Sequence, residues 1–561
     1  MPRNTPPEPA RPPDDSLLIP ALILALREGY GAARLRADAI AALTVAIVAL
    51  PLSMAIAIAA GGTPEMGLYT AIFGGFFVSL LGGSRHQIGG PAGAFIVLMA
   101  TTVALHGIDG LILATAMSGV MLAGLGVLRL GSYIKFVPYP VTVGFTAGIA
   151  VIIFASQIKE ILGLTLGAPE PGPLLEKLPV IWASLPTLNP ATLALSAGTV
   201  AIIVVLKRLA PAVPGLLVAV IAITLAAMLG DLPVATIGSV FGELPSHLPL
   251  PGLPEISLEK LGAVLPSAIA FTLLGAIESL LSAIVADGMT GRRHNSNMEL
   301  VAQGAANMAS ALFGGMAVTG TIARTATNVR AGGITPVAGM LHAGFILCFL
   351  LVAAPLASFI PLAALAGVLA VVAWNMIERE AIRALLRASR GDAAVLLVTF
   401  FLTIFRDLTE AIVVGFALGS VLFIHRMSSA IEVRAHTSTP PENDGDANGL
   451  AVEHDIVVYQ IRGAFFFGSV ASISSVLDRI AAQNRGLILD FSEVIFTDSS
   501  AANLIEGMVH KARKNGVAVV LACTDHATRV QLFAQGIKPP LVQYQPSVDL
   551  AKQALRRRIA Q

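Results

Sequence analysis

Charged residues and cysteines are both scarce in this chain. Only 13% of its 561 residues are charged, and a formal net charge of +1 argues against a nucleic-acid partner. The two cysteines, Cys348 and Cys523, form neither a disulfide framework nor a metal-ligand spacing. The sequence contains no Walker loop, GxGxxG motif or Ser-His-Asp order in a supporting context. It therefore predicts neither an enzyme nor a cofactor or metal.

Apolar residues dominate instead. They make up 55% of the chain, and the mean hydropathy is +0.78, so we predict a polytopic membrane protein surrounded by lipid. Residues 1–36 are expected to form a disordered N-terminal tail and then an interfacial helix, because proline-rich polar sequence precedes an apolar run that carries Arg27, Glu28, Arg34 and Arg36. The tail lacks the apolar core of a signal peptide.

Fourteen apolar segments follow in two sets of seven. The expected segments are 38–60, 66–82, 91–105, 110–128, 137–157, 191–207 and 211–229, then 263–286, 299–313, 319–331, 335–355, 357–376, 392–406 and 408–425. The third segment of each set is short and interrupted. Because each half has an odd number of spans, the halves have opposite orientations. We predict a transmembrane domain over residues 37–427, built as a seven-plus-seven inverted repeat.

The two interrupted segments are typical of an anion site. Residues 314–333 contain a helix of about eleven residues, too short for a bilayer that takes roughly 20. Its glycine-rich and hydroxyl-rich start places free N–H groups and the positive end of the helix dipole together. Residues 82–97 repeat the plan, with Pro91 opening a short apolar helix. Paired interruptions indicate a transporter's binding site, and re-entrant packing elements are the alternative.

The distribution of basic residues predicts the orientation. With a cytoplasmic N-terminus, the inner loops contain Arg85, Arg129, Lys135, Lys207, Arg208, Arg292, Arg293, Arg379, Arg383, Arg387, Arg390 and Arg426. The longest outer loop, about 230–262, has four acidic residues against Lys260 alone. This is the positive-inside pattern. Arg406 and Asp407 are expected to pair at the outer end of a span.

The C-terminal part differs in composition. Residues 428–452 are predicted to be a linker, and 453–561 a small cytoplasmic α/β domain. The expected strands are 456–461, 486–490 and 518–523, and the expected helices are 470–483, 500–515 and 547–558.

Several motifs then resemble a known family. ALTVAIVALPLSMA (42–55), GLYTAIFGG (67–75), IGGPAGAF (88–95), RHNSNMEL (293–300), RTATNVRAGG (324–333) and IPLAALAGVL (360–369) are similar to the sulfate permease, or SulP, family of anion transporters. The C-terminal FFFG and LDFSEVIFTDSS (489–500) resemble its STAS domain. The resemblance implies a homodimer in which a core carries the anion against a gate. Many sulfate-type members have Gln where this chain has Leu52, which leaves sulfate, bicarbonate and carboxylates open.

Glu278 is the candidate cation-coupling residue. It lies in the middle of an apolar span, where an ionisable group is costly and usually functional. The resemblance places it near the anion site. It is either a proton carrier or a ligand for Na⁺, and a structural hydrogen bond to the first span is the alternative.

The candidate anion-site residues come from the two interrupted segments. Phe95 and Ala323 are expected to wall the pocket, although Phe95 also suits core packing. The candidate donors are the backbone N–H groups of Gly93, Ala94 and Arg324 and the hydroxyls of Thr321 and Thr325. The Arg324 guanidinium either pairs with Glu278, captures the anion directly or supplies positive field, and we favour the field.

Two further sites receive weaker predictions. His294, in a cytoplasmic loop, is expected to be structural. Asp498, Ser499 and Ser500 resemble a turn that is phosphorylated in related anti-sigma-factor antagonists, although a role as helix N-cap already explains either serine.

The predicted function is secondary active transport of sulfate, bicarbonate or a dicarboxylate across the inner membrane. Coupling to H⁺ or Na⁺ would use Glu278, and the movement would be that of an elevator. A channel or an exchanger of the same fold is the alternative. A membrane-anchored enzyme or sensor is disfavoured, because fourteen spans exceed what anchoring needs.

Overall fold

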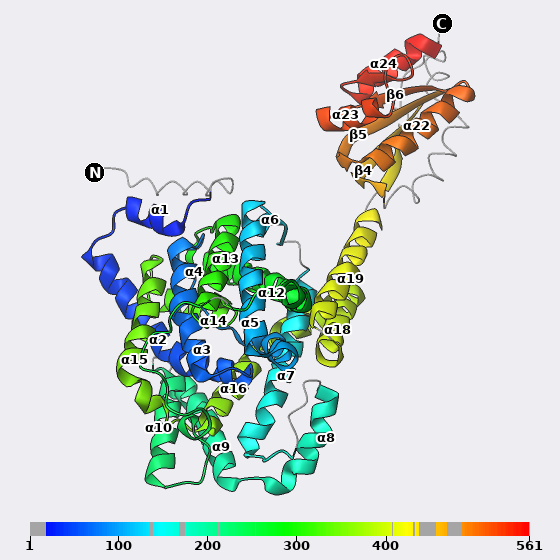
Figure 1. The fold of residues 1–561 in the computed structure, drawn as a ribbon. Coiled ribbons are helices and arrows are strands. Elements are labelled where there is room, and N and C mark those ends of the chain that lie inside the picture. The colour runs from blue at the N-terminus through cyan, green and yellow to red at the C-terminus, as the bar shows by residue number, and fades with distance from the viewer. Residues whose placement is uncertain are drawn as a thin grey trace. The chain divides into compact units, whose positions relative to one another are not determined.

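The computed structural model describes residues 18–134, 138–167, 174–210, 213–252, 254–406, 408–429, 432–436, 456–467 and 485–559. The chain divides into two compact units, Met1–Phe416 and Ala417–Gln561. The first is helical and the second contains the α/β sheet (Figure 1). Expectations for the tail at 1–17, Lys135, Asp407, most of the linker and the helix at 470–483 lie outside the described residues.

The N-terminal region begins with two helices, not the one expected. Helix α1 spans Ala21–Arg27, and α2 spans Ala32–Ala59. The prediction of a single helix over 17–36 was wrong because Gly29 adopts a φ of 88° between them. Glu28 follows α1 and accepts hydrogen bonds from the Arg85 guanidinium, which holds the pKa of that carboxyl below its usual value.

All seven segments expected in the first half are helical. They correspond to α2, to the run α3 (Pro64–Tyr69), η1 (Thr70–Gly74) and α4 (Gly75–Leu81), to η2 (Gly93–Phe95) with α5 (Ile96–Val127), and to α7 (Tyr139–Leu162), α9 (Pro190–Leu209) and α10 (Gly215–Leu229). Helix α5 covers two expected segments and breaks at Gly107, whose φ is 69°. Short α6 (Gly131–Ile134), α8 (Leu174–Ser184) and η3 (Leu185–Thr187) were not expected.

The second half also follows the expected order. Its segments are α12 (Leu258–Thr290), α13 (Ser296–Leu312), α14 (Ile322–Arg330), α15 (Val337–Ala357), α16 (Leu362–Met376), α18 (Arg390–Phe405) and α19 (Leu408–Ser429). Two unexpected helices are α11 (Ile237–Phe241) and amphipathic α17 (Arg379–Ala388). Among the described residues, nine helices are long and apolar enough to cross a membrane.

The helices of the first unit, which includes only the start of α19, pack into two groups. The first group, called the core, contains α2, α3, α4, α5, α12, α13, α14 and α15. The second group, called the gate, contains α7, α9, α10, α16, α18 and α19. Glycines allow close contact between core helices, because a Cβ on Gly304 of α13 would lie 2.5 Å from the Gly119 carbonyl oxygen of α5. Each group takes corresponding segments from both halves, as an inverted repeat requires.

A two-stranded ribbon joins the interruptions of the two halves. Strand β1 (Gly89–Gly90) pairs antiparallel with β2 (Thr319–Gly320), which places Gly89 opposite Gly320 and Gly90 opposite Thr319. Neighbouring side chains leave no room for a larger residue at these glycines, since a Cβ on Gly320 would lie 1.6 Å from Nε2 of Gln87. Because unpaired backbone groups are costly inside a membrane, this pairing makes the interruptions tolerable there.

The second unit is an α/β domain. Its strands, β3 (Glu432–His436), β4 (Ile456–Phe465), β5 (Gly486–Thr497), β6 (Ala518–Ala522) and β7 (Gln543–Gln545), lie in that order, and all neighbours are parallel except β3 and β4. One apolar cluster contains residues of the sheet together with α22 (Ser499–Lys514) and α23 (His526–Ala534). A second cluster contains other residues of the sheet together with α24 (Val548–Ile559). The three expected strands and the two expected helices that fall in described residues are confirmed. Strands β3 and β7 and helix α23 were missed.

Candidate functional site

The site is built around the β1–β2 ribbon, which η2–α5 and α14 flank with their N-terminal ends. The ribbon continues into α14, because Thr321 N–H donates to the Ile88 carbonyl at 3.1 Å. It is also fixed to α12, where Thr319 Oγ1 donates to the Gly275 carbonyl at 3.3 Å. Both half-helices therefore begin at a backbone that the rest of the core holds in place.

The backbone N–H donors in the first turn of α14 receive no side-chain cap. The N-cap residue is Thr321, but its side chain makes no capping hydrogen bond. The first backbone bond of the turn runs from Thr325 N–H to the Thr321 carbonyl, so the N–H groups of Ile322, Ala323 and Arg324 precede the intrahelical ladder. Ala323 and Ile322 are exposed. These donors are thus available to an anion.

The first turn of η2 faces the gate. Its N-cap, Ala92, also makes no side-chain cap, and Gly93 and Ala94 supply the first two N–H groups. A Cβ on Gly93 would approach Met376 of α16 at 3.6 Å and Ile153 of α7 at 3.8 Å. The donors expected from sequence therefore lie where core and gate meet.

Arg324, in the first turn of α14, is buried. Its side chain is 2% exposed, and Nη2 donates to Ser53 Oγ of α2 at 3.1 Å. Its Nε and Nη1 atoms have no hydrogen-bond partner, and no carboxylate forms an ion pair with it among the described residues. A buried guanidinium without a counterion leaves net positive field in the site. The pairing with Glu278, which was one of the expected options, is absent.

The two threonines of the α14 start have different environments. Thr325 is fully buried, and its hydroxyl oxygen accepts from Ile88 N–H at 3.2 Å and Ser282 Oγ at 3.1 Å. It joins β1, α12 and α14. Thr321 is half-buried, and its Oγ1 atom has no partner. Thr321 therefore has the freer hydroxyl, and ligand binding by either residue stays a prediction.

Phe95 lies at the candidate site and also packs against the core. It is 1% exposed, and its ring meets Phe271 of α12 edge-on with centroids 5.9 Å apart. This is the packing that we had weighed against a role as a pocket wall, and the two roles are compatible.

Glu278 does not face the ribbon. The positions of α12 that contact the two interruptions are Gly275, Ser279 and Ser282. Glu278 instead lines a small cavity with α7 and α19. Its carboxylate has no hydrogen bond or ion pair within the described residues, so the expected alternative of a structural bond to the first span is not seen there.

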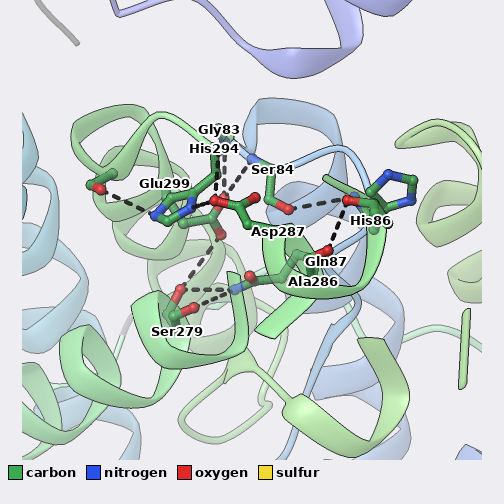
Figure 2. A network of polar contacts seen from close by, with 11 residues as sticks. Gly83, Ser84, His86, Gln87, Ser279, Ala286, Asp287, His294 and Glu299 are labelled. Atoms are coloured by element: carbon green, nitrogen blue, oxygen red, sulfur yellow. Dashed lines mark hydrogen bonds and ion pairs between the residues drawn. The ribbon is translucent and has the colours of Figure 1, made fainter. Parts of the chain in front are cut away.

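Sequence reasoning missed a polar network at one end of the core (Figure 2). Glu299 of α13 is fully buried and accepts from the N–H groups of Gly83 and Ser84 at 2.9 and 3.0 Å and from Gln303 Nε2 at 3.0 Å. His294 Nδ1 lies 2.7 Å from Asp287 Oδ2, and its expected structural role stays a prediction. The clue was an acid inside the RHNSNMEL motif. No metal-binding cluster occurs in the part of the chain that the structure describes.

The α/β unit requires one correction. The N-cap of α22 is Asp498, not a serine, because Asp498 Oδ1 accepts from Ala501 N–H at 2.9 Å. Ser499 and Ser500 occupy the first turn and are exposed. Capping therefore does not explain them, and their phosphorylation stays a prediction.

Comparison with known proteins then decides the family. The model of the sulfate permease family matches residues 35–399, and the model of the STAS domain matches residues 450–551. The chain belongs to the sulfate permease family. Its C-terminal unit is the STAS domain of such a protein, as the sequence motifs implied.

Relatives of this sulfate permease family member cover most of its length. The putative sulfate transporter YvdB of Bacillus subtilis is 42% identical over 500 residues, which are 88% of this chain and 92% of that protein. The bicarbonate transporter BicA of Synechocystis is 32% identical and spans 89% and 90% of the two chains. The inward-facing structure of murine Slc26a9 has a TM-score of 0.85 at 18% identity and covers 99% and 96%. The last likeness shows the fold alone.

Proposed function

We propose that this protein is a secondary active transporter of a small oxyanion. The observation that carries the proposal is the pair of uncapped half-helix starts beside a buried arginine without a counterion. Backbone donors and positive field at one place suit an anion, and they do not suit a cation or an apolar solute.

Sulfate and bicarbonate are the favoured substrates, with dicarboxylates next. YvdB is named a putative sulfate transporter and BicA a bicarbonate transporter, so related chains take more than one oxyanion by name. The donors of this site are mostly backbone N–H groups, with Phe95 and Ala323 as apolar walls. Such a site selects for charge and size more than for one hydrogen-bonding pattern.

The movement that we infer is an elevator-like shift of the core against the gate. The ribbon ties both half-helices into one core group, whereas the gate atoms nearest to a Cβ on Gly93 belong to side chains of α7 and α16. The expected membrane is the inner membrane, with the STAS domain cytoplasmic and a homodimer as the assembly. We also propose that the transmembrane domain covers residues 37–427 and that a linker over residues 428–452 joins it to the STAS domain.

Coupling to a cation is assigned to Glu278. A carboxylate within an apolar membrane span has to be neutralised by a proton or a counterion, and the described residues provide no counterion for Glu278. An uncoupled channel or an exchanger of the same fold has no need for this acid. We therefore favour symport with H⁺, and Na⁺ is the competing ion.

The test uses the full-length protein in proteoliposomes. Labelled sulfate, bicarbonate and fumarate are offered in parallel, first for counterflow and then for accumulation under an imposed pH or Na⁺ gradient. The variant Glu278→Gln mimics the neutral acid, so it should keep counterflow and lose gradient-driven accumulation. A mutant that concentrates its substrate as the wild type does would show that Glu278 is not the coupling residue.

A further inference from the structure

Glu278 lies on the side of α12 that turns toward the gate. Glu278 lines a cavity of about 20 Å³ together with Thr142, Phe145 and Thr146 of α7 and Ile412 of α19. The residues of α12 that contact the ribbon, Gly275, Ser279 and Ser282, form a different helical stripe. The coupling acid thus belongs to the interface between core and gate rather than to the anion site.

The two threonines of α7 present only acceptors to this cavity. Thr142 Oγ1 donates its hydrogen to the Tyr139 carbonyl at 2.8 Å, and Thr146 Oγ1 donates to the Thr142 carbonyl at 2.8 Å. A hydroxyl has one hydrogen and two lone pairs. Because both hydrogens bond the backbone of their own helix, lone pairs remain for any other partner.

An ionised Glu278 would add more acceptors to the same cavity and leave it without a donor. Glu278 is the only titratable group among the lining residues. Charged groups on the neighbouring helices have other partners: Asp287 of α12 bonds to His294, and Arg324 of α14 bonds to Ser53. Lys159 and Glu160 of α7 pair with each other, and Glu410 of α19 pairs with Arg406 at 3.3 Å. The arrangement is satisfied when the carboxyl carries a hydrogen or when a cation fills the cavity.

The surroundings of Glu278 favour a proton on its carboxyl group over a metal cation in the cavity. A cavity of about 20 Å³ admits one particle of the size of water. Hard cations are usually held by about six oxygens. The cavity offers the two carboxylate oxygens and two hydroxyls, and its other walls are apolar.

We propose that protonated Glu278 donates its single hydrogen to the hydroxyl oxygen of Thr142 or Thr146 of α7, which makes these threonines positioning residues for proton coupling. The inference rests on the proposed transport function. A proton that enters from one side forms the O–H bond of Glu278, and this O–H group bonds across to α7. When the core shifts along the gate, that hydrogen bond breaks, and the proton leaves to the other side. The carboxylate is regenerated without any other reactant.

The experiment compares Thr142→Val/Thr146→Val with the wild type in proteoliposomes under a pH gradient, using labelled sulfate, bicarbonate and fumarate. Valine preserves shape and removes the acceptors. The protonated acid then loses its partner, so half-maximal uptake should require a pH lower by about one unit. Counterflow without a gradient should remain, which shows that the protein is folded. The Thr142→Ser/Thr146→Ser variant should restore the wild-type pH profile.

Thr101→Val is the matched control. Thr101 of α5 back-bonds to the Val97 carbonyl at 2.9 Å in the same way, but it is exposed and outside the cavity. A double valine variant with the wild-type pH profile would overturn the inference. Wild-type uptake that follows a Na⁺ gradient, with a higher half-saturating Na⁺ concentration in the valine variant, would also overturn it in favour of a sodium site. Absence of any gradient-driven uptake in the wild type would instead refute the proposed function.

Discussion

Replacement of Gly90 by alanine tests whether the field of Arg324 holds the anion. Gly90 lies in β1 and does not have a positive φ, so alanine fits its backbone. The new Cβ would lie 1.7 Å from Nη1 of Arg324. The guanidinium would have to retreat, and its hydrogen bond to Ser53 would be strained or lost.

The size of the effect follows from that overlap. Ordinary van der Waals contact begins at 3.4 Å, so the guanidinium would move by roughly 1.7 Å. For an anion on the order of 5 Å away and an effective dielectric constant of about 20, the attraction falls from about 3.3 to about 2.5 kcal/mol. That difference of about 0.8 kcal/mol corresponds to a roughly fourfold loss of affinity.

The assay is the dissociation constant of sulfate and of bicarbonate for purified protein, measured by concentration-dependent thermal stabilisation. The matched control is Gly124→Ala in α5, where a Cβ would meet nothing within 4 Å, and it should bind as the wild type does. If Gly90→Ala is folded and binds both anions with unchanged affinity, the positive field of Arg324 does not determine binding. Ser53→Ala should weaken binding in the same direction, because it frees the guanidinium from α2.

Two other expectations concern topology and modularity. A cysteine at Glu255 should react with an impermeant reagent from outside whereas one at Arg383 should not, and the reverse pattern would contradict the fourteen-span arrangement. Truncation after Ser429, the last residue of α19, should leave anion binding measurable even if the transport rate falls, because the ribbon and Arg324 are in the first unit. Loss of binding in a folded truncated protein would show that the STAS domain contributes to the site.

Much of the fold was accessible from the sequence because membrane spans are set by length and apolarity. The fourteen segments, their order and the two interruptions follow from that rule alone. Amphipathic α17 was missed because its arginines were counted only as loop charges. The β1–β2 pairing could not be foreseen, since nothing in two short glycine-rich stretches specifies the partner of each.

The site was predicted less completely for a related reason. Residue types identified Arg324 and Glu278, but only the rotation of each helix decides what a side chain faces. Glu278 and Ser279 are neighbours in sequence, yet one turns to α7 and the other binds Gln87. Thr142 and Thr146 drew no attention because threonine is ordinary in an apolar span. Their role depends on the hydroxyl hydrogens, which the sequence does not reveal.

The ribbon between the two halves also has a consequence for biosynthesis. Gly89 and Gly90 reach the membrane long before Thr319 and Gly320 leave the ribosome, so the first half has to insert while the backbone of its interruption lacks its strand partner. Completion of the core is therefore a late event, delayed until the tenth segment is translated. Nascent chains that stop before residue 320 should be recognised by membrane quality control, and co-expressed half-proteins should stabilise each other.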